Sequence, residues 1–190
     1  MRSSPPKAVT LVLGGARSGK SRYAQELASA FERVVFIATA RRHDAEMRAR
    51  IARHRRERPS SWKTIEASTG LDRALREQCQ GADLLLIDCL TLYLANIMGR
   101  KPGERRQVRR QIQNLCEAIG ETKASVVIVS NEVGSGVVPP YRSGREYRDL
   151  LGEFNQAIAQ LADRVVLMVA GLPLIVKDRP KGRKMVGKKG

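Results

Sequence analysis

Short apolar runs rich in Val, Ile and Leu recur along the chain and are typical of strands buried on both faces. The clearest runs lie at residues 9–13, 34–38, 83–88, 124–130 and 164–170, and shorter extended segments lie at 62–67 and 174–176. Stretches with helical spacing separate them, at about 21–31, 44–58, 71–79, 90–98, 104–119 and 145–161. Because strands alternate with helices, the pattern predicts an α/β fold whose mostly parallel sheet carries helices on both faces.

The first predicted strand leads directly into a glycine-rich octapeptide. Its residues fit G-x-x-x-x-G-K-[ST] at every fixed position: Gly14, Gly15, Ala16, Arg17, Ser18, Gly19, Lys20 and Ser21. A strand before this pattern and a helix after it are the context of a P-loop, in which backbone N–H groups and a helix N-terminus face a phosphate. We expect Lys20 to reach the β- and γ-phosphates and Ser21 to ligate Mg²⁺. The alternative is a chance glycine-rich turn, which the flanking elements disfavour.

Polar residues follow three other predicted strands. Thr39 and Ala40 follow the strand at 34–38, and Asp88 ends the strand at 83–88. A long loop, residues 131–144, follows the strand at 124–130. Ligands of open α/β sheets gather at the carboxyl ends of strands. Asp88 resembles a Walker B carboxylate, so we expect it to hold Mg²⁺ or to meet the nucleoside; capping of the following helix is the alternative.

The predicted helix at 44–58 carries one of the two histidines of the chain. Four of its residues share one helical face: Met47, Ile51, His54 and Arg58. Asp44 is a plausible N-cap, and Pro59 bounds the helix. From composition alone, His54 reads as a surface histidine in an arginine-rich helix.

The chain is strongly basic, with 35 Lys and Arg against 19 Asp and Glu and a net charge of +16. Arginines crowd residues 41–58 and 100–110, and the tail after residue 176 is also basic. Such a charge suits nucleic acid, anionic small molecules such as nucleotides, or simply a solvated basic face. The aromatic content of 4% argues against a stacking platform for single-stranded nucleic acid.

Composition also restricts the cellular location of the protein and the number of its domains. No apolar run is long enough to span a bilayer, and residues 1–7 lack a secretory core. The three cysteines form no metal-ligand spacing, and an odd number leaves one unpaired, which favours reduced thiols and a cytoplasmic protein. We expect one domain over residues 8–177, with flexible basic ends at 1–7 and 178–190.

Several motifs together resemble one family, the bifunctional adenosylcobinamide kinase / adenosylcobinamide-phosphate guanylyltransferases of cobalamin biosynthesis. The resemblance runs from about Val9 to Lys177. Besides the P-loop, the matching residues are Ile37 to Thr39, Asp44 to Met47, Arg50-Ile51, His54, Arg58-Pro59, Trp62, Asp88 to Thr91, Asn131 to Gly134, Gly136, Pro139, Arg148-Asp149, Gly152 and Asn155-Gln156. A P-loop alone is common, but the histidine helix and the Asn-Glu-Val-Gly loop at these distances are specific.

The resemblance implies a set of site residues. His54 matches the family's guanylylated histidine, whereas His43 does not occupy that position. The implied nucleotide contacts are Gly14 to Ser21, Ala38, Thr39, Ala40, Arg55, Arg56, Glu57, Arg58, Glu66 and Asp88. Some family members carry Glu where this chain has Asp88, whose carboxylate lies on a shorter side chain.

The resemblance also implies the reaction and the partners. The family phosphorylates the hydroxyl of adenosylcobinamide with ATP or GTP in the presence of Mg²⁺, and then transfers GMP from GTP to the new phosphate. A P-loop NTPase-type, RecA-like fold, a homotrimer, a corrinoid substrate and no nucleic-acid partner follow from it. The loop at 134–144 borders the predicted cleft, so we expect it to meet the corrinoid. Arginines beside His54 are expected to depress its pKa and to bind phosphate oxygens.

Three other functions remain open at this point. One is a simple P-loop kinase of a small hydroxyl substrate, in which His54 is structural. Another is a RecA-like nucleic-acid-binding ATPase, which the charge of +16 favours. The third is a module that binds nucleotide without turnover.

Overall fold

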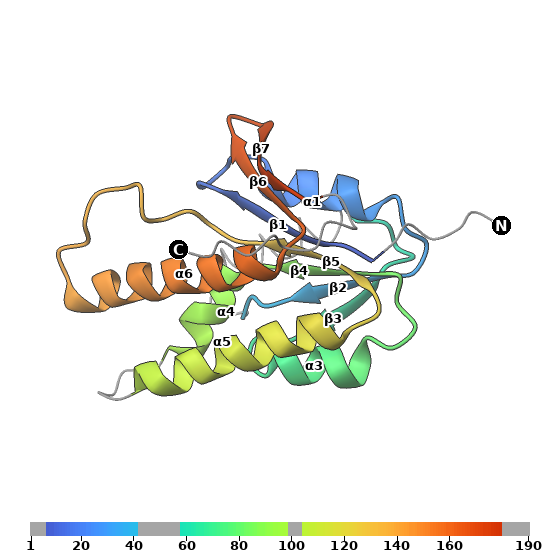
Figure 1. Ribbon diagram of the computed structural model, residues 1–190, viewed down its shortest axis with the longest axis horizontal. Coiled ribbons are helices and arrows are strands. Elements are labelled where there is room, and N and C mark those ends of the chain that lie inside the picture. The colour runs from blue at the N-terminus through green and yellow to red at the C-terminus, as the bar shows by residue number, and fades with distance from the viewer. Residues whose placement is uncertain (1–6, 42–57, 99–103, 180–190) are drawn as a thin grey trace, which may run out of the picture.

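The computed structural model describes residues 7–41, 58–98 and 104–179 (Figure 1). Its helices are α1 (Lys20–Ala28), α3 (Leu71–Gln78), α4 (Leu90–Ile97), α5 (Glu104–Glu121) and α6 (Arg142–Leu161). Its strands are β1 (Val9–Gly14), β2 (Val34–Ala38), β3 (Lys63–Glu66), β4 (Leu84–Asp88), β5 (Ser125–Val129), β6 (Arg164–Val169) and β7 (Leu172–Asp178). Each apolar run recognised in the sequence is a strand.

The seven strands form one sheet in the order β3-β2-β4-β5-β1-β6-β7. All neighbouring strands pair parallel except β6 and β7, which pair antiparallel. The predicted α/β fold with a mostly parallel sheet is confirmed. Because β1 to β6 are parallel, their carboxyl ends meet at one edge of the sheet, and the loops that follow them are neighbours in space.

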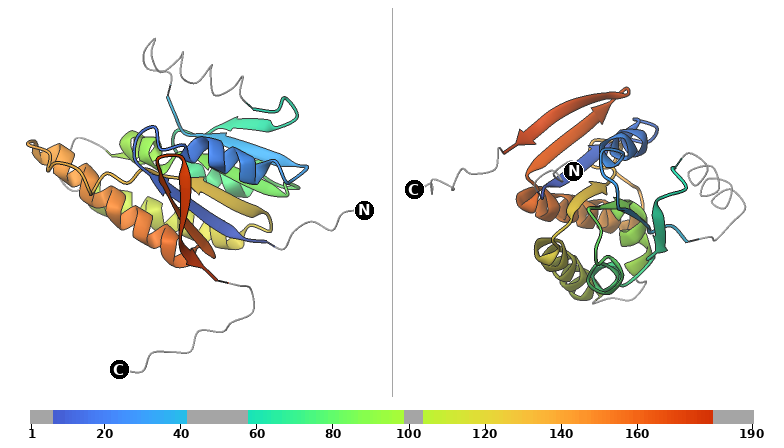
Figure 2. Two further views of the ribbon diagram at one scale, coloured as in Figure 1. Left: turned by 90° about the horizontal axis from the view of Figure 1, so that it is seen from above. Right: turned by 90° about the vertical axis from the view of Figure 1, so that its right-hand side faces the viewer.

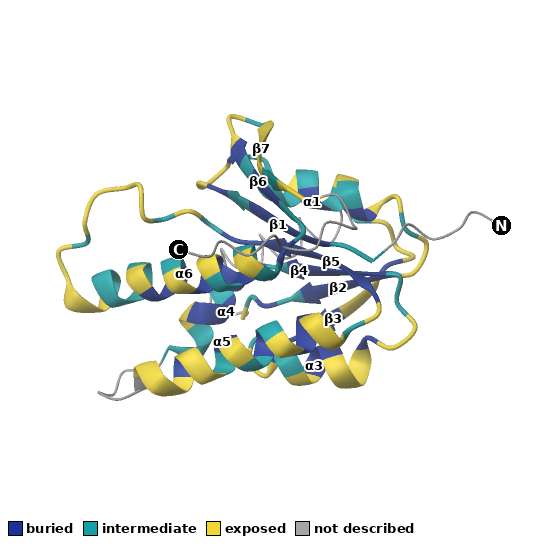
Figure 3. Ribbon diagram, in the orientation of Figure 1, coloured by how far each residue is buried: buried dark blue, intermediate teal, exposed yellow. Residues whose placement is uncertain are grey.

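Alternating side chains of the strands point to opposite faces and build two cores. On β1, Leu11 belongs to the core under α3, α4, α5 and α6, whereas Val12 belongs to the core under α1. On β4, Leu85 and Leu86 divide in the same way. Helices therefore cover both faces, with α1 alone on its face among the described helices (Figure 2), and the buried strands run between them (Figure 3).

The start of α6 differs from the prediction. Helical spacing predicted a start at Arg145, but the helix begins at Arg142 and takes Gly144 into its first turn. Glycine is a poor helix former, which is why the sequence pattern placed Gly144 in the loop. A Cβ on Gly144 would lie 2.8 Å from the Cβ of Pro139, so glycine lets the preceding loop fold back against the helix. At the opposite end of the chain, α1 ends at Ala28 and not near Phe31.

The last strand is longer than the short segment predicted at 174–176. Ala170 and Gly171 both have positive φ, 51° and 84°, and form a tight turn that returns the chain alongside β6. Pro173 lacks an N–H donor, and β7 is the edge strand that tolerates it. The strand includes Asp178, which the sequence had assigned to a flexible end; that boundary was placed one residue too early.

The residues that flank the predicted domain boundaries make contacts. Lys7 Nζ donates a hydrogen bond of 2.9 Å to the carbonyl of Gly120, so Lys7 also belongs to the folded part. Lys177 Nζ donates to three carbonyls at the end of α6, those of Ala159, Gln160 and Ala162. A cation at a helix C-terminus is favourable because it satisfies unpaired carbonyls and complements the helix dipole. Residues 1–6 and 180–190 lie outside the described part.

We expect Phe154→Ala to lower the free energy of unfolding by about 3–5 kcal/mol. Phe154 is completely buried on α6, and its ring centroid lies 6.4 Å from that of Tyr93, so truncation leaves a cavity between α6 and α4. Urea unfolding followed by circular dichroism would measure the loss. The matched control is Gln160→Ala, an exposed position on the same helix, which should change stability by less than about 0.5 kcal/mol.

Candidate functional site

The P-loop connects the carboxyl end of β1 to the start of α1. Gly19 adopts φ 89° at the N-cap of α1, a conformation that glycine reaches without steric cost. The ammonium of Lys20, in the first turn of the helix, donates a hydrogen bond of 2.9 Å to the carbonyl of Gly15. Lys20 therefore lies back over the loop, where an incoming phosphate would meet both its ammonium and the helix N-terminus.

Neighbouring strands hold this loop on two sides. The N–H of Gly171, in the turn between β6 and β7, donates to the carbonyl of Ser18 at 3.1 Å. The N–H of Glu132, beyond β5, donates to the carbonyl of Gly14 at 3.2 Å. Ser18 is buried, and its Oγ has no hydrogen-bond partner within the described ranges, a feature expected where a ligand completes the site.

Thr39 joins the ends of β2 and β4. Its hydroxyl donates to the carbonyl of Cys89 at 2.7 Å and accepts from the N–H of Cys89 at 2.8 Å. Its backbone N–H donates to the carbonyl of Asp88, and its carbonyl accepts from the amide of Asn96. Every polar group of this fully buried threonine thus has a protein partner. The sequence predicted Thr39 as a nucleotide contact; it missed this structural role, and a threonine at a strand end gave no signal for it.

Three predicted contacts lie around the ends of β2, β3 and β4. Ala38 pairs with Asp88 on one side and with Glu66 on the other, so both carboxylates reach the same edge of the sheet. Asp88 is half-buried, and so is Ala40, which comes two residues after Ala38. Glu66 is exposed. The structure therefore brings Ala38, Asp88 and Glu66 together at the edge that carries the P-loop.

Cys89 follows Asp88 and lies close enough to both charges of the site to be affected by them. Burial raises the pKa of its thiol to about 11; the carboxylate of Asp88 adds to this rise and the ammonium of Lys20 opposes it. The thiol is thus protonated at neutral pH and is a poor nucleophile. Its side chain belongs to the apolar core on the α1 face of the sheet.

The donor set suits Mg²⁺. The hydroxyl of Ser21 and the carboxylate of Asp88 are hard oxygen ligands, and Mg²⁺ typically binds one or two such protein groups together with substrate phosphates and water. No cluster of three or more His, Cys, Asp or Glu side chains with metal-binding geometry is found in the described residues. A site that relies on substrate oxygens needs no such cluster.

Behind the P-loop, a polar network fixes the end of β5. The N–H of Asn131 donates to Thr91 Oγ1 at 3.0 Å, and its carbonyl accepts from the amide of Asn155 at 3.0 Å. Asn155 also accepts from the hydroxyl of Ser130, and Tyr147 donates to the carbonyl of Thr91. The network ties α4 and α6 to the strand end. Asn131 Oδ1 is buried, and the described residues offer it no partner. Sequence reasoning matched Thr91, Asn131 and Asn155 to a family pattern but gave them no role, and it did not single out Ser130 or Tyr147.

Arg58 is the one member of the predicted arginine cluster at 55–58 that the structure describes. Its guanidinium lies 3.5 Å from the centroid of the Phe36 ring on β2, a cation–π contact on the α1 face of the sheet. The chain therefore rejoins the sheet at Arg58, in a bend. His54, Arg55, Arg56 and Glu57, and the remainder of the predicted helix at 44–58, lie outside the described residues.

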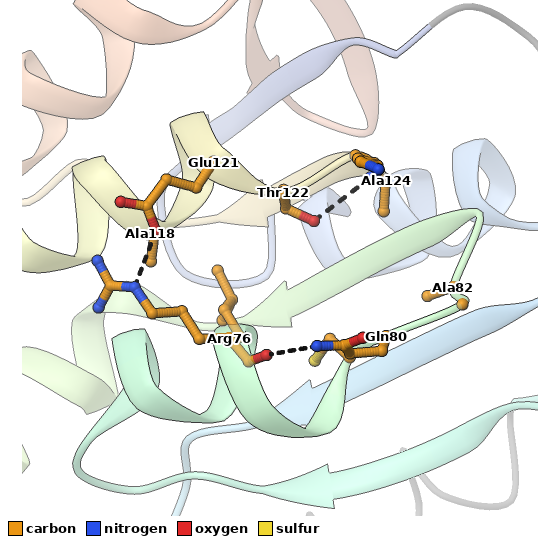
Figure 4. A pocket seen from close by; sticks show the side chains of 11 residues that line it. Arg76, Gln80, Ala82, Ala118, Glu121, Thr122 and Ala124 are labelled. Atoms are coloured by element: carbon orange, nitrogen blue, oxygen red, sulfur yellow. Dashed lines mark hydrogen bonds and ion pairs between the residues drawn. The ribbon is translucent and has the colours of Figure 1, made fainter.

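A separate pocket of about 430 Å³ lies at the opposite edge of the sheet (Figure 4). It opens between the C-terminal ends of α3 and α5, beside the segments that enter β4 and β5. Arg76 donates to the carboxylate of Glu121 across it at 2.9 Å. It contains none of the predicted site residues.

In the described part, no helix is both long and apolar enough to cross a membrane.

A P-loop at the carboxyl edge of a parallel sheet with helices on both faces defines an α/β protein of the P-loop nucleotide-binding class. The profile of one family in that class, cobinamide kinase / cobinamide phosphate guanyltransferase, matches residues 10–176. The chain belongs to this family, as the motifs in its sequence predicted.

Curated relatives agree with this assignment. The chain is 44% identical to the bifunctional adenosylcobalamin biosynthesis protein CobP of Pseudomonas aeruginosa, over 90% of this chain and 98% of that protein. It is 39% and 37% identical to the CobU proteins of Salmonella typhimurium and Escherichia coli, in each case over 88% of this chain and 98% of the relative. Among solved structures, the RadB recombinase matches with a TM-score of 0.47 and 15% identity, over 85% of this chain and 74% of that one.

We expect Gly14→Ala to weaken nucleotide binding by more than about tenfold, a loss of at least about 1.4 kcal/mol. A Cβ at this position would lie 2.4 Å from Ser18 Oγ and 2.9 Å from the backbone carbonyl oxygen of Met168, so the loop must shift. Titration with a fluorescent GTP analogue in the presence of Mg²⁺ would measure the affinity.

The matched control is Gly15→Ala, one residue further along the same loop. A Cβ there would meet no described atom within 4 Å beyond its neighbours in the chain, and Gly15 does not have positive φ. Its affinity should stay within about threefold of wild type. Equal losses for both variants would show that the close packing at Gly14 is not what shapes the phosphate site.

Proposed function

We propose that this chain phosphorylates the hydroxyl of adenosylcobinamide with ATP or GTP and then transfers GMP from GTP to the new phosphate, giving adenosylcobinamide-GDP. The observation that carries the proposal is a complete P-loop, with Lys20 folded over it, in a chain that a cobinamide kinase / cobinamide phosphate guanyltransferase profile matches over residues 10–176. The relatives are named as bifunctional proteins of adenosylcobalamin biosynthesis.

For the kinase step, the chain supplies position and positive charge. Phosphoryl transfer needs little covalent help from the protein, because charge spreads over the phosphate oxygens in the transition state. Lys20 and the N–H groups at the start of α1 bind those oxygens. Ser21 and Asp88 would hold Mg²⁺, which neutralises charge on the β- and γ-phosphates. Ala38, Ala40, Glu66 and the Arg55 to Arg58 segment are proposed to hold the remainder of the nucleotide.

For the guanylyl step, His54 is the proposed nucleophile. Its neutral imidazole nitrogen attacks the α-phosphorus of GTP, and the bond to pyrophosphate breaks. The phosphate oxygen of the corrinoid then attacks the same phosphorus, the P–N bond breaks, and the imidazole is restored. Direct attack of one anionic phosphate on another is hindered by charge repulsion, so a neutral first nucleophile divides one difficult step into two.

Two further properties belong to this proposal. We propose that the chain forms a homotrimer, and the exposed apolar side chains of β7, among them Leu172, Leu174 and Val176, support an interface at that edge of the sheet. We also propose that the chain has no nucleic-acid partner and is located in the cytoplasm. The cytoplasmic location is supported by the three cysteines, which are all free, as expected in a reducing compartment.

The guanylyl half is tested without any corrinoid. The full-length chain is incubated with Mg²⁺ and GTP labelled at the α-phosphate, denatured, and examined for label on the protein. We expect an acid-labile, base-stable adduct, which is the behaviour of a phosphoramidate. His54→Ala should abolish labelling and yet keep measurable kinase activity with ATP and adenosylcobinamide.

His43→Ala is the matched control, because it removes the other histidine of the chain, just before the same predicted helix, and it should label as wild type does. Labelling that survives in His54→Ala, or equal loss of both activities in a folded variant, would contradict the assignment. A wild-type chain that binds GTP without labelling would leave a simple P-loop kinase.

The shared use of one P-loop gives a second test. Lys20→Ala should lower both the kinase rate and the labelling rate by at least about a hundredfold, because both reactions place phosphates against the same loop. Single-turnover assays of each step would measure the two losses. If one rate stays intact, the two reactions use separate nucleotide sites.

A further inference from the structure

The loop between β5 and α6 exposes large apolar side chains. Val137, Val138 and Tyr141 are 96%, 59% and 77% exposed. Most of the loop before α6 is coloured as exposed in Figure 3. Large apolar groups that lie together on a surface usually mark a place where something binds, because leaving them in water is unfavourable. This loop lies beyond the carboxyl ends of the strands, on the side of the molecule that carries the P-loop (Figure 1).

Specific contacts hold the loop in place. Arg145 Nη1 donates to the carbonyls of Pro139 and Pro140 at 3.0 and 2.7 Å. The close approach of Pro139 to Gly144 packs the loop against the first turn of α6. Two consecutive prolines further restrict the backbone. The apolar side chains are thus presented by a preorganised segment, which lowers the entropic cost of binding a ligand.

The root of the loop contacts the P-loop directly. β5 lies between β1 and β4 in the sheet, so the chain leaves β5 between Gly14 and Asp88. The N–H of Glu132 donates to the carbonyl of Gly14, and the carboxylate of Glu132 accepts from the N–H of Gly134 at 2.6 Å. A substrate whose reacting end lies at the P-loop would therefore have this loop beside it.

A second exposed apolar surface, on β7, has different chemistry. β7 is an edge strand, with unpaired backbone groups along one side that suit pairing with another chain. The loop offers projecting side chains and no strand edge. A second copy of the chain fits β7 better, and a bulky ligand with apolar surface fits the loop better.

We propose that Val137, Val138 and Tyr141 form the surface that binds the corrin ring of the acceptor. The inference rests on the proposed function, which makes the acceptor a large macrocycle that carries its reacting hydroxyl on a short arm. The hydroxyl must reach the γ-phosphate at the P-loop, whereas the ring is too large to follow it between the strand ends. The ring then lies at the rim of the site, against the apolar part of the loop whose root meets Gly14, and leaves its amide side chains in water.

The test separates corrinoid binding from nucleotide chemistry. The double variant Val137→Ser/Val138→Ser and the single variant Tyr141→Ser are compared with wild type in the full-length protein. We expect each to raise the KM for adenosylcobinamide in the kinase reaction, by about tenfold for the double variant, with kcat changed by less than about twofold. Equilibrium dialysis with adenosylcobinamide alone should show the same loss of affinity.

Two controls belong to this experiment. Ser135→Ala alters the same exposed loop and removes no apolar surface, so its KM should match wild type. Self-labelling from GTP requires no corrinoid, so every loop variant should label at the wild-type rate, which also shows that it is folded.

The outcomes distinguish the two proposals. A wild-type chain that neither labels nor phosphorylates adenosylcobinamide overturns the proposed function. A wild-type chain that does both, with loop variants of unchanged KM, overturns the assignment of the loop alone. A loop variant that changes the oligomeric mass in light scattering, with unchanged corrinoid affinity, assigns the surface to contacts between copies and also overturns it.

Discussion

Parallel pairing of β1 with β5 and β6 is the constraint on which the site depends. It brings the ends of these strands to one edge, and the chain must then turn at Gly14 in a space that admits no side chain. The P-loop, the end of β5 and the turn after β6 meet there through backbone hydrogen bonds. The phosphate-binding loop therefore takes its shape from the sheet as much as from its own glycines.

Much of the fold could be predicted from the sequence, because strands buried on both faces have continuous apolar runs. The P-loop was visible for a similar reason, since its glycines and lysine are local requirements. The length of β7 and the start of α6 depend on tertiary contacts. The turn at Ala170-Gly171 brings an exposed strand back to pair with β6, and Gly144 lies in a helical turn that Pro139 approaches closely. The periodicity of the local sequence predicts neither the length of β7 nor the start of α6.

Some features of the candidate site could likewise be predicted from the sequence, and others depend on the fold. The positions of Lys20, Ser21 and Asp88 at the carboxyl edge of the sheet could be predicted from motif and strand order. The structural role of Thr39 could not, because its hydroxyl bonds to a residue fifty positions away in the sequence. The network around Asn131 likewise joins segments that only the fold brings together. The role of His54 stays a prediction from the family pattern, because composition alone had favoured a surface residue and His54 lies outside the described residues.

The turn between β6 and β7 has a consequence for how this chain is studied. Gly171 contacts the phosphate loop through Ser18, and the strand that leaves this turn is the exposed, apolar edge of the sheet. A molecule that seats against that edge is one hairpin away from the residues that hold the nucleotide. A partner bound at that edge would reach the P-loop through this hairpin, so rate constants for this chain should be compared at the same protein concentration.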